Sequence, residues 1–237
     1  MGVKLVEDPA LRDRLAVFRD RPHAGAVLAR LLSAHGLDER ARVLAIPAGG
    51  VPVAAALADA LGLPLDVVVV SKITLPWNTE VGYGAVAFDG SCLLNDALVR
   101  HVGLRSDEAE HGVEVTRAKV ARRVRLLRGD EPLDVIGSTV IVVDDGLASG
   151  FTLRAALAAL RRAGAAHVIV AVPTGPLDGA QRLAREVDAL FVANLRSGSS
   201  FAVADAYERW SDVSEDEARE LLARRGAQAT RASAAPR

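Results

Sequence analysis

The chain has 237 residues and a mass of 24.9 kDa, which suits one large domain or two small ones. Half of the residues are apolar and a quarter are charged, as in an ordinary globular protein. The formal charge of −1 argues against binding to nucleic acid or to an anionic membrane through bulk charge. A single cysteine, Cys92, excludes an intrachain disulfide and a cysteine zinc cluster. The charged start lacks the apolar core of a signal peptide, so we expect a cytoplasmic protein without a membrane partner.

Apolar runs of strand length alternate with helical patterns along the chain. Residues 67–70, 140–143 and 168–172 are runs of valine, isoleucine and alanine without polar alternation. Strands that are covered on both faces have this pattern, so we expect an α/β fold with an open, mainly parallel sheet flanked by helices. The strands expected are 42–47, 65–73, 83–88, 92–95, 139–143, 167–173 and 189–193.

Capping residues indicate where the helices begin. Asp20 is expected to cap the first helix and Ser106 a long one, whose acidic first half and basic second half complement the helix dipole. Ser214 and Glu217 form a capping box for the last helix. We expect helices at 20–35, 53–61, 106–128 and 214–225, and read residues 226–237 as a disordered tail because they have no periodic apolar face.

Residues 139–160 carry the clearest chemical signal. A buried strand ends in two acids, Asp144 and Asp145, and a loop of small residues, 146–150, then leads into a helix. In an open parallel sheet, ligands bind beyond the carboxyl ends of the strands, and a helix N-terminus attracts anions. Ser149, Gly150 and Thr152 suit a phosphate, because glycine allows close backbone approach and the hydroxyls donate hydrogen bonds.

The two acids suit a sugar beside that phosphate. Together they can grip a vicinal diol, and a phosphate with a diol indicates a ribose 5-phosphate. The loop has neither the Gly-Lys-Ser/Thr ending of a Walker A loop nor a GxGxxG dinucleotide pattern. Two alternatives stay open on these residues alone: a plain strand-to-helix turn with solvated aspartates, or a phosphatase-like or receiver-like domain that phosphorylates Asp144 or Asp145.

Residues 141–152, IVVDDGLASGFT, resemble the phosphoribosyl pyrophosphate signature of type I phosphoribosyltransferases. Further stretches across residues 15–225 look like stand-alone phosphoribosyltransferase-like proteins whose substrates are largely uncharacterised. These stretches are FRDRPHAGAVLA (18–29), LAIPAGGVPVAA (44–55), VSKITLPWNTEVGYGAV (70–86) and FAVADAYERWSDVS (201–214).

The resemblance implies roles for two loops. Asp144 and Asp145 would hold the ribose hydroxyls, and the loop after them would hold the 5-phosphate. That phosphate loop is Gly146, Leu147, Ala148, Ser149, Gly150, Phe151 and Thr152. Residues 47–51 look like the pyrophosphate loop, with Ala48, Gly49 and Gly50 as binding residues. Three positions depart from the family pattern: Ala48 stands where an arginine is often found, Gly146 where an aliphatic residue is common, and Ser149 where a threonine is common.

The resemblance also implies a third catalytic residue and a lid. Lys72 is expected to follow a buried strand and contact the diphosphate; the alternative is a lysine whose stem merely covers a strand end. Residues 74–84 resemble the mobile loop that closes over the substrates. Trp77 on this lid is either a gate or an anchor.

The chain is expected to form a single domain, residues 1–225, with a core at about 36–195. A hood from residues 1–35 and 196–225 would cover the acceptor. The aromatic residues Phe201, Tyr207 and Trp210 could stack a base there, or could simply pack the hood.

The function implied is transfer of the 5-phosphoribosyl group from phosphoribosyl pyrophosphate to a nitrogenous base, with release of pyrophosphate, as in nucleotide salvage. Mg²⁺ would be carried mainly by the pyrophosphate, since the five histidines have no metal-ligand spacing. The alternative is a non-catalytic regulator that binds phosphoribosyl pyrophosphate or a nucleotide, which Ala48 favours. A homodimer is left open.

Overall fold

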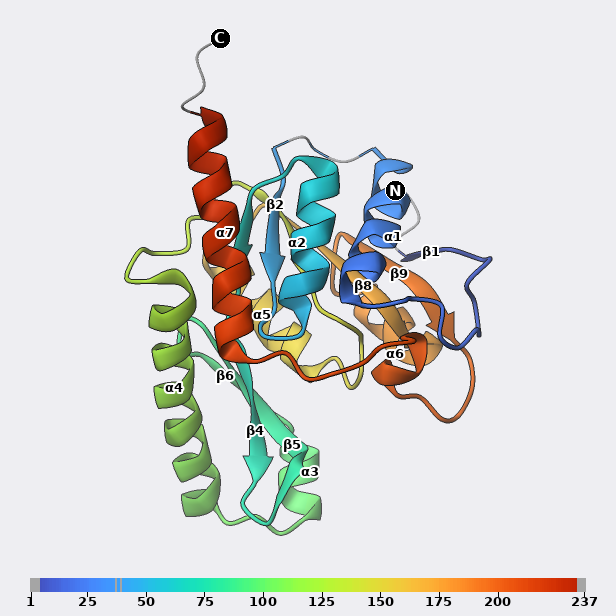
Figure 1. Cartoon of the computed structure of the whole chain (residues 1–237). Helices are drawn as coiled ribbons and strands as arrows, with labels where there is room; N and C mark the ends of the chain where they lie inside the picture. Colours follow the sequence, from blue (N-terminus) through green and yellow to red (C-terminus); the bar gives the residue numbers. More distant parts are fainter. Residues whose placement is uncertain (1–4, 37, 39, 234–237) are drawn as a thin grey trace.

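The computed structural model describes residues 5–36, 38 and 40–233 (Figure 1). Its main sheet has six strands, all parallel, in the order β1-β9-β8-β7-β2-β3. The expected α/β class with a mainly parallel sheet is therefore confirmed. The strands are β1 (Leu5–Glu7), β2 (Arg42–Ala45), β3 (Leu65–Val67), β7 (Thr139–Val143), β8 (His167–Pro176) and β9 (Ala189–Arg196).

Helices cover both faces of the main sheet. On one face lie α1 (Arg21–Ser33) and α2 (Gly50–Leu61), and on the other α5 (Phe151–Arg162) and α6 (Leu177–Leu183). The last helix, α7 (Glu215–Ser233), packs against α2 and α4. The apolar run of β7 supplies both cores: Ile141 and Val143 join the α1–α2 side, and Val140 and Val142 join the α5 side. This explains why the run lacks polar alternation.

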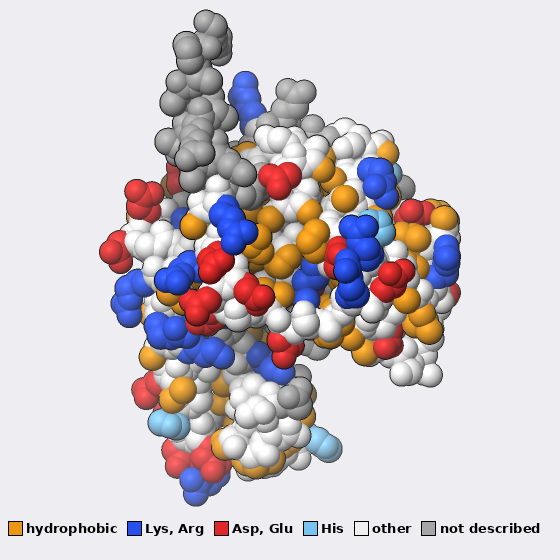
Figure 2. All heavy atoms as spheres, viewed as in Figure 1, with side chains coloured by type: hydrophobic (Ala, Val, Ile, Leu, Met, Phe, Trp, Pro, Cys, Tyr) orange, Lys and Arg blue, Asp and Glu red, His pale blue; other side chains and the backbone are white. Residues whose placement is uncertain are grey.

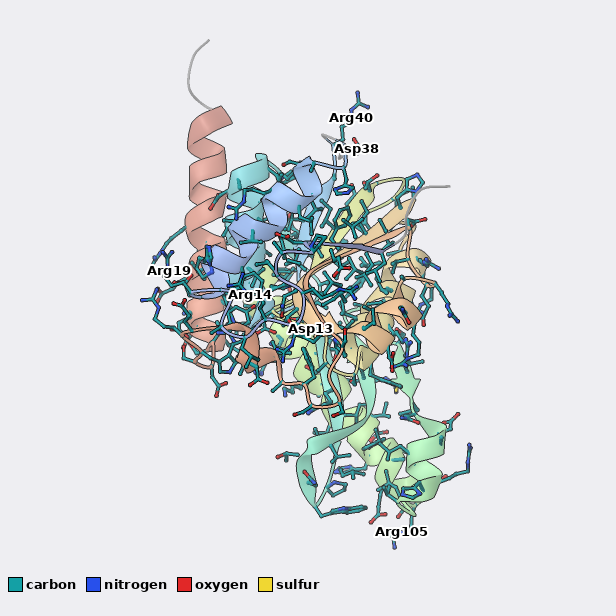
Figure 3. All side chains as sticks on the ribbon, turned by 90° about the vertical axis from the view of Figure 1, so that its right-hand side faces the viewer. Asp13, Arg14, Arg19, Asp38, Arg40 and Arg105 are labelled. Carbon is teal, nitrogen blue, oxygen red and sulfur yellow. The ribbon has the colours of Figure 1, made fainter. Side chains whose placement is uncertain are left out.

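A second, antiparallel sheet forms a small lobe at the end toward which β2 runs (Figure 1). The lobe consists of β4 (Val70–Leu75), β5 (Asn78–Ala87), β6 (Cys92–Leu94), α3 (Asp96–His101) and the long helix α4 (Ser106–Arg128). In the space-filling view it stands clear of the body on one side (Figure 2). Figure 3 shows Arg105 at its far end, with Asp38 and Arg40 at the opposite end of the molecule.

One expected strand is wrong. Residues 65–73 do not form a single strand, because β3 ends at Val67 in the main sheet and β4 begins at Val70 in the small one. Val68 and Val69 connect them and are fully buried. Since the connection is as apolar as the strands, the valine run does not reveal where the chain leaves one sheet for the other.

Of the two helix caps expected at Asp20 and Ser106, one is confirmed. The side chain of Asp20 accepts a hydrogen bond from the N–H of His23 at 3.0 Å, as expected of a cap. Ser106, however, is the first residue of α4 and not its cap; Arg105 is the cap, and its N–H donates to Glu108 at 3.1 Å.

The last helix begins where the sequence predicts but ends later than predicted. The capping box is confirmed: the N–H of Glu217 donates to Ser214 Oγ at 3.1 Å, and the N–H of Ser214 donates to Glu217 Oε2 at 2.7 Å. But α7 continues through Gly226 to Ser233, so the expected end before Gly226 is wrong. Residues 234–237 of the expected tail lie outside the described residues. The domain boundaries themselves stay a prediction.

The two segments assigned to the hood lie side by side. Phe18 pairs in parallel with Tyr207, and its N–H donates to the carbonyl of Ala206 at 2.9 Å. Glu208 and Arg209 then donate to the carbonyls of Phe18 and Arg19. Residues 18–19 and 206–209 thus meet, although nearly 190 positions separate them in the sequence. None of the helices in the described part of the chain is both long and apolar enough to span a membrane.

Candidate active site

The two acids and the small-residue loop line one cavity beyond the carboxyl end of β7. Its volume is about 170 Å³, and its walls are Asp144, Asp145, Gly146, Ala148, Ser149, Gly150, Thr152, Leu153 and Val203. The cavity lies where an open parallel sheet places its ligands. The structure therefore brings together Asp144, Asp145 and five of the seven residues expected in the phosphate loop.

Two expected loop residues do not face this cavity. The side chain of Leu147 is buried in the core, and its N–H donates to the carbonyl of Thr174 at 2.8 Å. Phe151 is the first residue of α5 and packs partly against the same core. Gly150 precedes it as the helix cap with φ +71°, a conformation that favours glycine. The N–H of Phe151 donates to Ser149 Oγ at 3.4 Å. The next N–H groups of the first turn have no acceptor within the helix and are available to an anion.

The expected pyrophosphate loop lies directly against the acids. The N–H of Ile46, before the loop, donates to the carbonyl of Val143 at 2.8 Å. A β-carbon on Gly49 would overlap Asp145 Oδ2, and one on Gly50 would lie 2.7 Å from the carbonyl oxygen of Val143. Both glycines are thus required by contact with the end of β7. The peptide bond between Pro47 and Ala48 is cis.

A buried arginine that sequence reasoning missed supports this loop. Arg123 of α4 donates from Nη2 to the carbonyl of Pro47 at 3.1 Å, and from Nη1 to Ser71 Oγ at 3.1 Å. Its Nε lies 2.7 Å from Glu215 Oε1, in an ion pair that lacks hydrogen-bond alignment. Arg123 thus joins the pyrophosphate loop to the small lobe and to the start of α7. Among six basic residues in the second half of α4, nothing local marks it.

Lys72 lies away from the cavity. It is exposed in the middle of β4, opposite Ala85 in the antiparallel sheet, and does not follow a strand of the main sheet. A β-carbon on Gly82 would overlap its side chain. The expected lid, residues 74–84, is the end of β4, a turn and most of β5, and Trp77 at the turn is 61 % exposed.

The three aromatic residues expected in the hood have different surroundings. The hydroxyl of Tyr207 donates to the backbone carbonyl of Asp145 at 2.7 Å, and its ring contacts Phe18, so it packs the hood. Trp210 is partly exposed, and its ring lies 3.8 Å from the guanidinium carbon of Arg21. Phe201 is not among the residues that line the cavity.

Arg21 is the second residue that sequence reasoning missed. It begins α1 directly after the Asp20 cap, and its Nε and Nη2 lie 3.0 and 2.9 Å from Asp145 Oδ2. The pair is 124 residues apart in sequence. The helix cap beside it was readable, but its partner across the fold was not.

Burial and proximity set the protonation of the acids. Burial and the neighbouring charge of Asp145 raise the pKa of Asp144 well above its ordinary value. Burial also raises the pKa of Asp145, while Arg21 acts in the opposite direction. Burial raises the pKa of Tyr207 too, so its hydroxyl stays a donor to the loop. Asp145, beside Arg21, is therefore the acid of the pair that ionises first.

A family comparison identifies this arrangement. The phosphoribosyl transferase domain model matches residues 20–206, which include both loops, both acids and Arg21. The chain belongs to the phosphoribosyl transferase family. Within that family it has the type I fold, as the resemblance implied.

Two known proteins are similar to this chain over most of its length. A Mycobacterium tuberculosis protein, found in strains CDC 1551 and H37Rv under the name "Putative phosphoribosyl transferase", is 37 % identical over 206 residues, or 86 % of the chain. The chain covers 46 % of that protein and so spans about half the length of the curated relatives it matches. The crystal structure of TT1426 from Thermus thermophilus is 34 % identical, with a TM-score of 0.68, over 86 % of this chain and 97 % of that one.

One departure from the family pattern has a structural explanation. Gly146 stands where an aliphatic residue is common, and a β-carbon there would overlap the side chain of Val203. Val203 begins the 3-10 turn of the hood (Val203–Ala206) and lines the cavity. In this phosphoribosyl transferase, an aliphatic side chain from the hood occupies the space beside the loop.

Proposed function

We propose that this phosphoribosyl transferase moves the 5-phosphoribosyl group from phosphoribosyl pyrophosphate to a ring nitrogen of a base or a similar acceptor, in the manner of nucleotide salvage. The observation that carries the proposal is one cavity lined by two adjacent acids, a small-residue loop and the start of a helix. The pyrophosphate loop lies against the same acids. Sites for a monoester, a diol and a diphosphate would then be neighbours, in the order in which these groups occur on the substrate.

Each part of the substrate has a partner of suitable chemistry. The ribose hydroxyls would bind Asp144 and Asp145, and the 5-phosphate would accept hydrogen bonds from Ser149, Thr152 and the available N–H groups of the first turn of α5. Each hydrogen bond to a charged group is worth roughly 1.5–3 kcal/mol, so four or five would hold the phosphate firmly. The pyrophosphate would lie along residues 47–51, where glycines leave the backbone open.

The reaction is a displacement at the anomeric carbon. The bond from C1 to the pyrophosphate oxygen breaks and the pyrophosphate keeps the electron pair. A bond from C1 to the acceptor nitrogen forms, and the proton on that nitrogen passes to solvent. The transition state resembles an oxocarbenium ion, which the carboxylate of Asp145 would stabilise electrostatically.

The donor set fits Mg²⁺ carried by the substrate. The described residues contain no group of three or more His, Cys, Asp or Glu side chains arranged to hold a metal ion. Mg²⁺ commonly binds through substrate phosphates and water with one or two carboxylates, so Asp144 and Asp145 are the side chains that would face it. When bound, it would neutralise the leaving pyrophosphate.

The proposed roles of Lys72 and of the lid, residues 74–84, require the small lobe to move. For Lys72 to contact the diphosphate, the small lobe must close toward the main sheet, because the lysine lies in β4 and outside the cavity wall. Closure of residues 74–84 would exclude water from the anomeric carbon. Trp77, exposed at the turn, would then be buried.

The test is a calorimetric titration with phosphoribosyl pyrophosphate and Mg²⁺, made on the wild type and on Asp144→Asn with Asp145→Asn. Micromolar binding by the wild type that the folded double variant loses would support the proposal. Pyrophosphate release is then measured with a panel of purine and pyrimidine bases. Equal binding by the double variant, or no binding by a folded wild type, would contradict it.

A second candidate is a non-catalytic regulator that binds phosphoribosyl pyrophosphate or a nucleotide. Ala48 favours it, because the loop lacks the arginine that often faces the leaving group in the family. Ala48→Arg separates the two: a rise in pyrophosphate release from a low level indicates an attenuated enzyme. Tight binding with no release in either form indicates a regulator.

A further inference from the structure

The buried ion pair between Arg21 and Asp145 is the contact that the proposed reaction has not used. Both donors on one edge of the guanidinium, Nε and Nη2, lie within 3.0 Å of the same oxygen, Asp145 Oδ2. The side chains are 8 % and 19 % exposed, so solvent screens the pair little. The other carboxylate oxygen, Oδ1, receives no hydrogen bond from Arg21.

Arg21 is itself held on two further sides. Its Nη1 donates to the carbonyl of Ser211 at 2.6 Å, and its guanidinium lies over the ring of Trp210 at 3.8 Å. A cation over an indole face is favourable, more so when it is shielded from water. The planar group is thus fixed between an aromatic ring, a carbonyl and a carboxylate.

The local helix does not account for an arginine at this position. Arg21 is the first residue of α1, where the helix dipole disfavours a cation, and the first turn of α1 has no acidic residue. Its favourable partner is Asp145, from the end of β7. Arg21 therefore stabilises Asp145, which lies across the fold, and does not stabilise α1.

The groups facing Asp145 come from four elements. α1 supplies Arg21, the end of β7 supplies the carboxyl of Asp144, and the segment after the 3-10 turn supplies the hydroxyl of Tyr207, which binds the backbone carbonyl of Asp145. The pyrophosphate loop supplies only the backbone of Gly49, which leaves no room for a side chain. Arg21 is the one cation among these groups.

We propose that Arg21 is a positioning residue, which holds Asp145 Oδ2 toward the hood and the pyrophosphate loop and leaves Oδ1 for the ribose of the substrate. This rests on the proposed function for its substrate. With Arg21 in place, one oxygen of the Asp145 carboxylate is fixed by the protein, and the other is available to accept a hydrogen bond from a ribose hydroxyl.

The opposite reading is a lock, in which Arg21 occupies Asp145 and must leave before the substrate binds. The two readings give opposite signs for one substitution. If Arg21 positions the acid, Arg21→Met weakens substrate binding; if it locks the acid, Arg21→Met strengthens it. Arg30→Met is the matched control, because Arg30 is an exposed arginine of the same helix.

The experiment uses the full chain and two readouts. The first is calorimetry with phosphoribosyl pyrophosphate and Mg²⁺ at pH 7. We expect Arg21→Met to bind at least tenfold more weakly than the wild type, and Arg21→Lys to recover part of the loss. Lysine keeps the charge but loses the planar pair of donors. Arg30→Met should bind as the wild type does.

The second readout needs no ligand, so failure of the proposed function can be told apart. Urea unfolding of Arg21→Met, Asp145→Asn and the double variant gives the coupling between the two side chains in the free protein. We expect Arg21→Met and Asp145→Asn to be strongly non-additive, and Arg30→Met and Asp145→Asn to add. Simple additivity of Arg21→Met and Asp145→Asn in folded proteins, or tighter substrate binding by Arg21→Met, overturns the positioning role. Non-additivity in a protein that binds no phosphoribosyl pyrophosphate upholds the Arg21–Asp145 relation and removes the proposed substrate.

Circular dichroism and Trp210 fluorescence verify folding. Trp77→Phe leaves Trp210 as the single tryptophan of the chain, next to Arg21. If Arg21→Met fails to fold, Trp210→Leu provides the second route. It removes the ring that holds Arg21 while keeping every charge, and we expect weaker binding of phosphoribosyl pyrophosphate than in the wild type. Wild-type affinity in a folded Trp210→Leu then counts against the proposal.

Discussion

Gly146 and Val203 fit together so closely that a β-carbon on the glycine would overlap the valine side chain. One residue belongs to the phosphate loop and the other to the hood. The loop could take its small residue because the hood supplies the aliphatic group that fills the space. This is a contact between two segments that the sequence separates by more than fifty positions, so a larger side chain at one position requires a smaller one at the other.

The first prediction concerns this contact. We expect Gly146→Val to destabilise the chain by about 1–3 kcal/mol, because overpacking forces neighbouring groups apart. Val203→Ala alone should cost less. In combination, the two should restore most of the stability and the binding of phosphoribosyl pyrophosphate. Urea unfolding of the four proteins measures the interaction energy. Simple additivity of the two changes would show that the contact does not constrain the loop.

The second prediction concerns Gly49. A methyl group at this position would overlap Asp145 Oδ2, so we expect Gly49→Ala to displace the acid and to weaken phosphoribosyl pyrophosphate binding at least tenfold. Gly198→Ala is the control, since a β-carbon there would meet its nearest neighbour at 3.9 Å. Calorimetry compares the two. Wild-type affinity in Gly49→Ala would mean that the acid tolerates the shift and that its position is not critical.

The third prediction compares two neighbouring arginines that share Glu215. Arg123 is buried and binds backbone carbonyls of two further segments, whereas Arg122 is 58 % exposed and pairs with Glu215 at 2.8 Å. We expect Arg123→Met to lower the free energy of unfolding by about 3 kcal/mol, because buried carbonyls lose their donors. Arg122→Met should change it by less than about 0.5 kcal/mol, as exposed ion pairs contribute little. Chemical unfolding measures both, and equal losses would refute the difference.

The fourth prediction concerns pH. The folded state raises the pKa of Asp144, so it binds a proton more tightly than the unfolded chain does. The resulting stabilisation is complete below the unfolded value of about 4 and is lost as the pH rises through the raised folded pKa. Asp144→Asn removes this dependence, since the amide stays neutral.

We therefore expect Asp144→Asn to gain stability relative to the wild type as the pH rises from 4 to 9. Urea unfolding across that range gives the difference at each pH. A constant difference would mean that Asp144 titrates normally in the folded protein. Asp178→Asn, at the start of α6 and far along the chain from the acid pair, serves as the control for the substitution itself.

The part of the site that lies in one continuous stretch was predictable. Residues 139–160 fold as strand, loop and helix because each local signal agrees: a buried run, then two acids, then small residues at a helix start. The pyrophosphate loop was readable for the same reason, as two glycines follow a buried strand. The sequence of the pyrophosphate loop does not show why Gly49 and Gly50 are glycines. The structure gives the reason: a β-carbon at either position would overlap residues at the end of β7 or just after it.

The residues that were missed act over long distances. Arg21 and Arg123 are two of 26 arginines. Arg21 lies in the stretch 18–29 that carries part of the resemblance, but nothing in that stretch indicates its partner, and no local pattern marks Arg123. Their partners, Asp145 and the carbonyl of Pro47, are 124 and 76 residues away. Pairings of that kind depend on the packing of helices against the sheet, which periodicity does not specify. The position of Lys72 was predicted wrongly for a different reason. The valine run before it suggested the end of one strand of the main sheet, but the chain has already entered the small antiparallel sheet at Val70.

The pairing of residues 18–21 with residues 206–211 has a consequence for synthesis. The carbonyl of Ser211 is made 190 residues after Arg21, which binds it. Every strand of the main sheet precedes Tyr207 and Trp210 in the chain, so the sheet can form before these residues leave the ribosome. The acids that follow β7 would then be enclosed only when residues 206–211 pack against the start of α1.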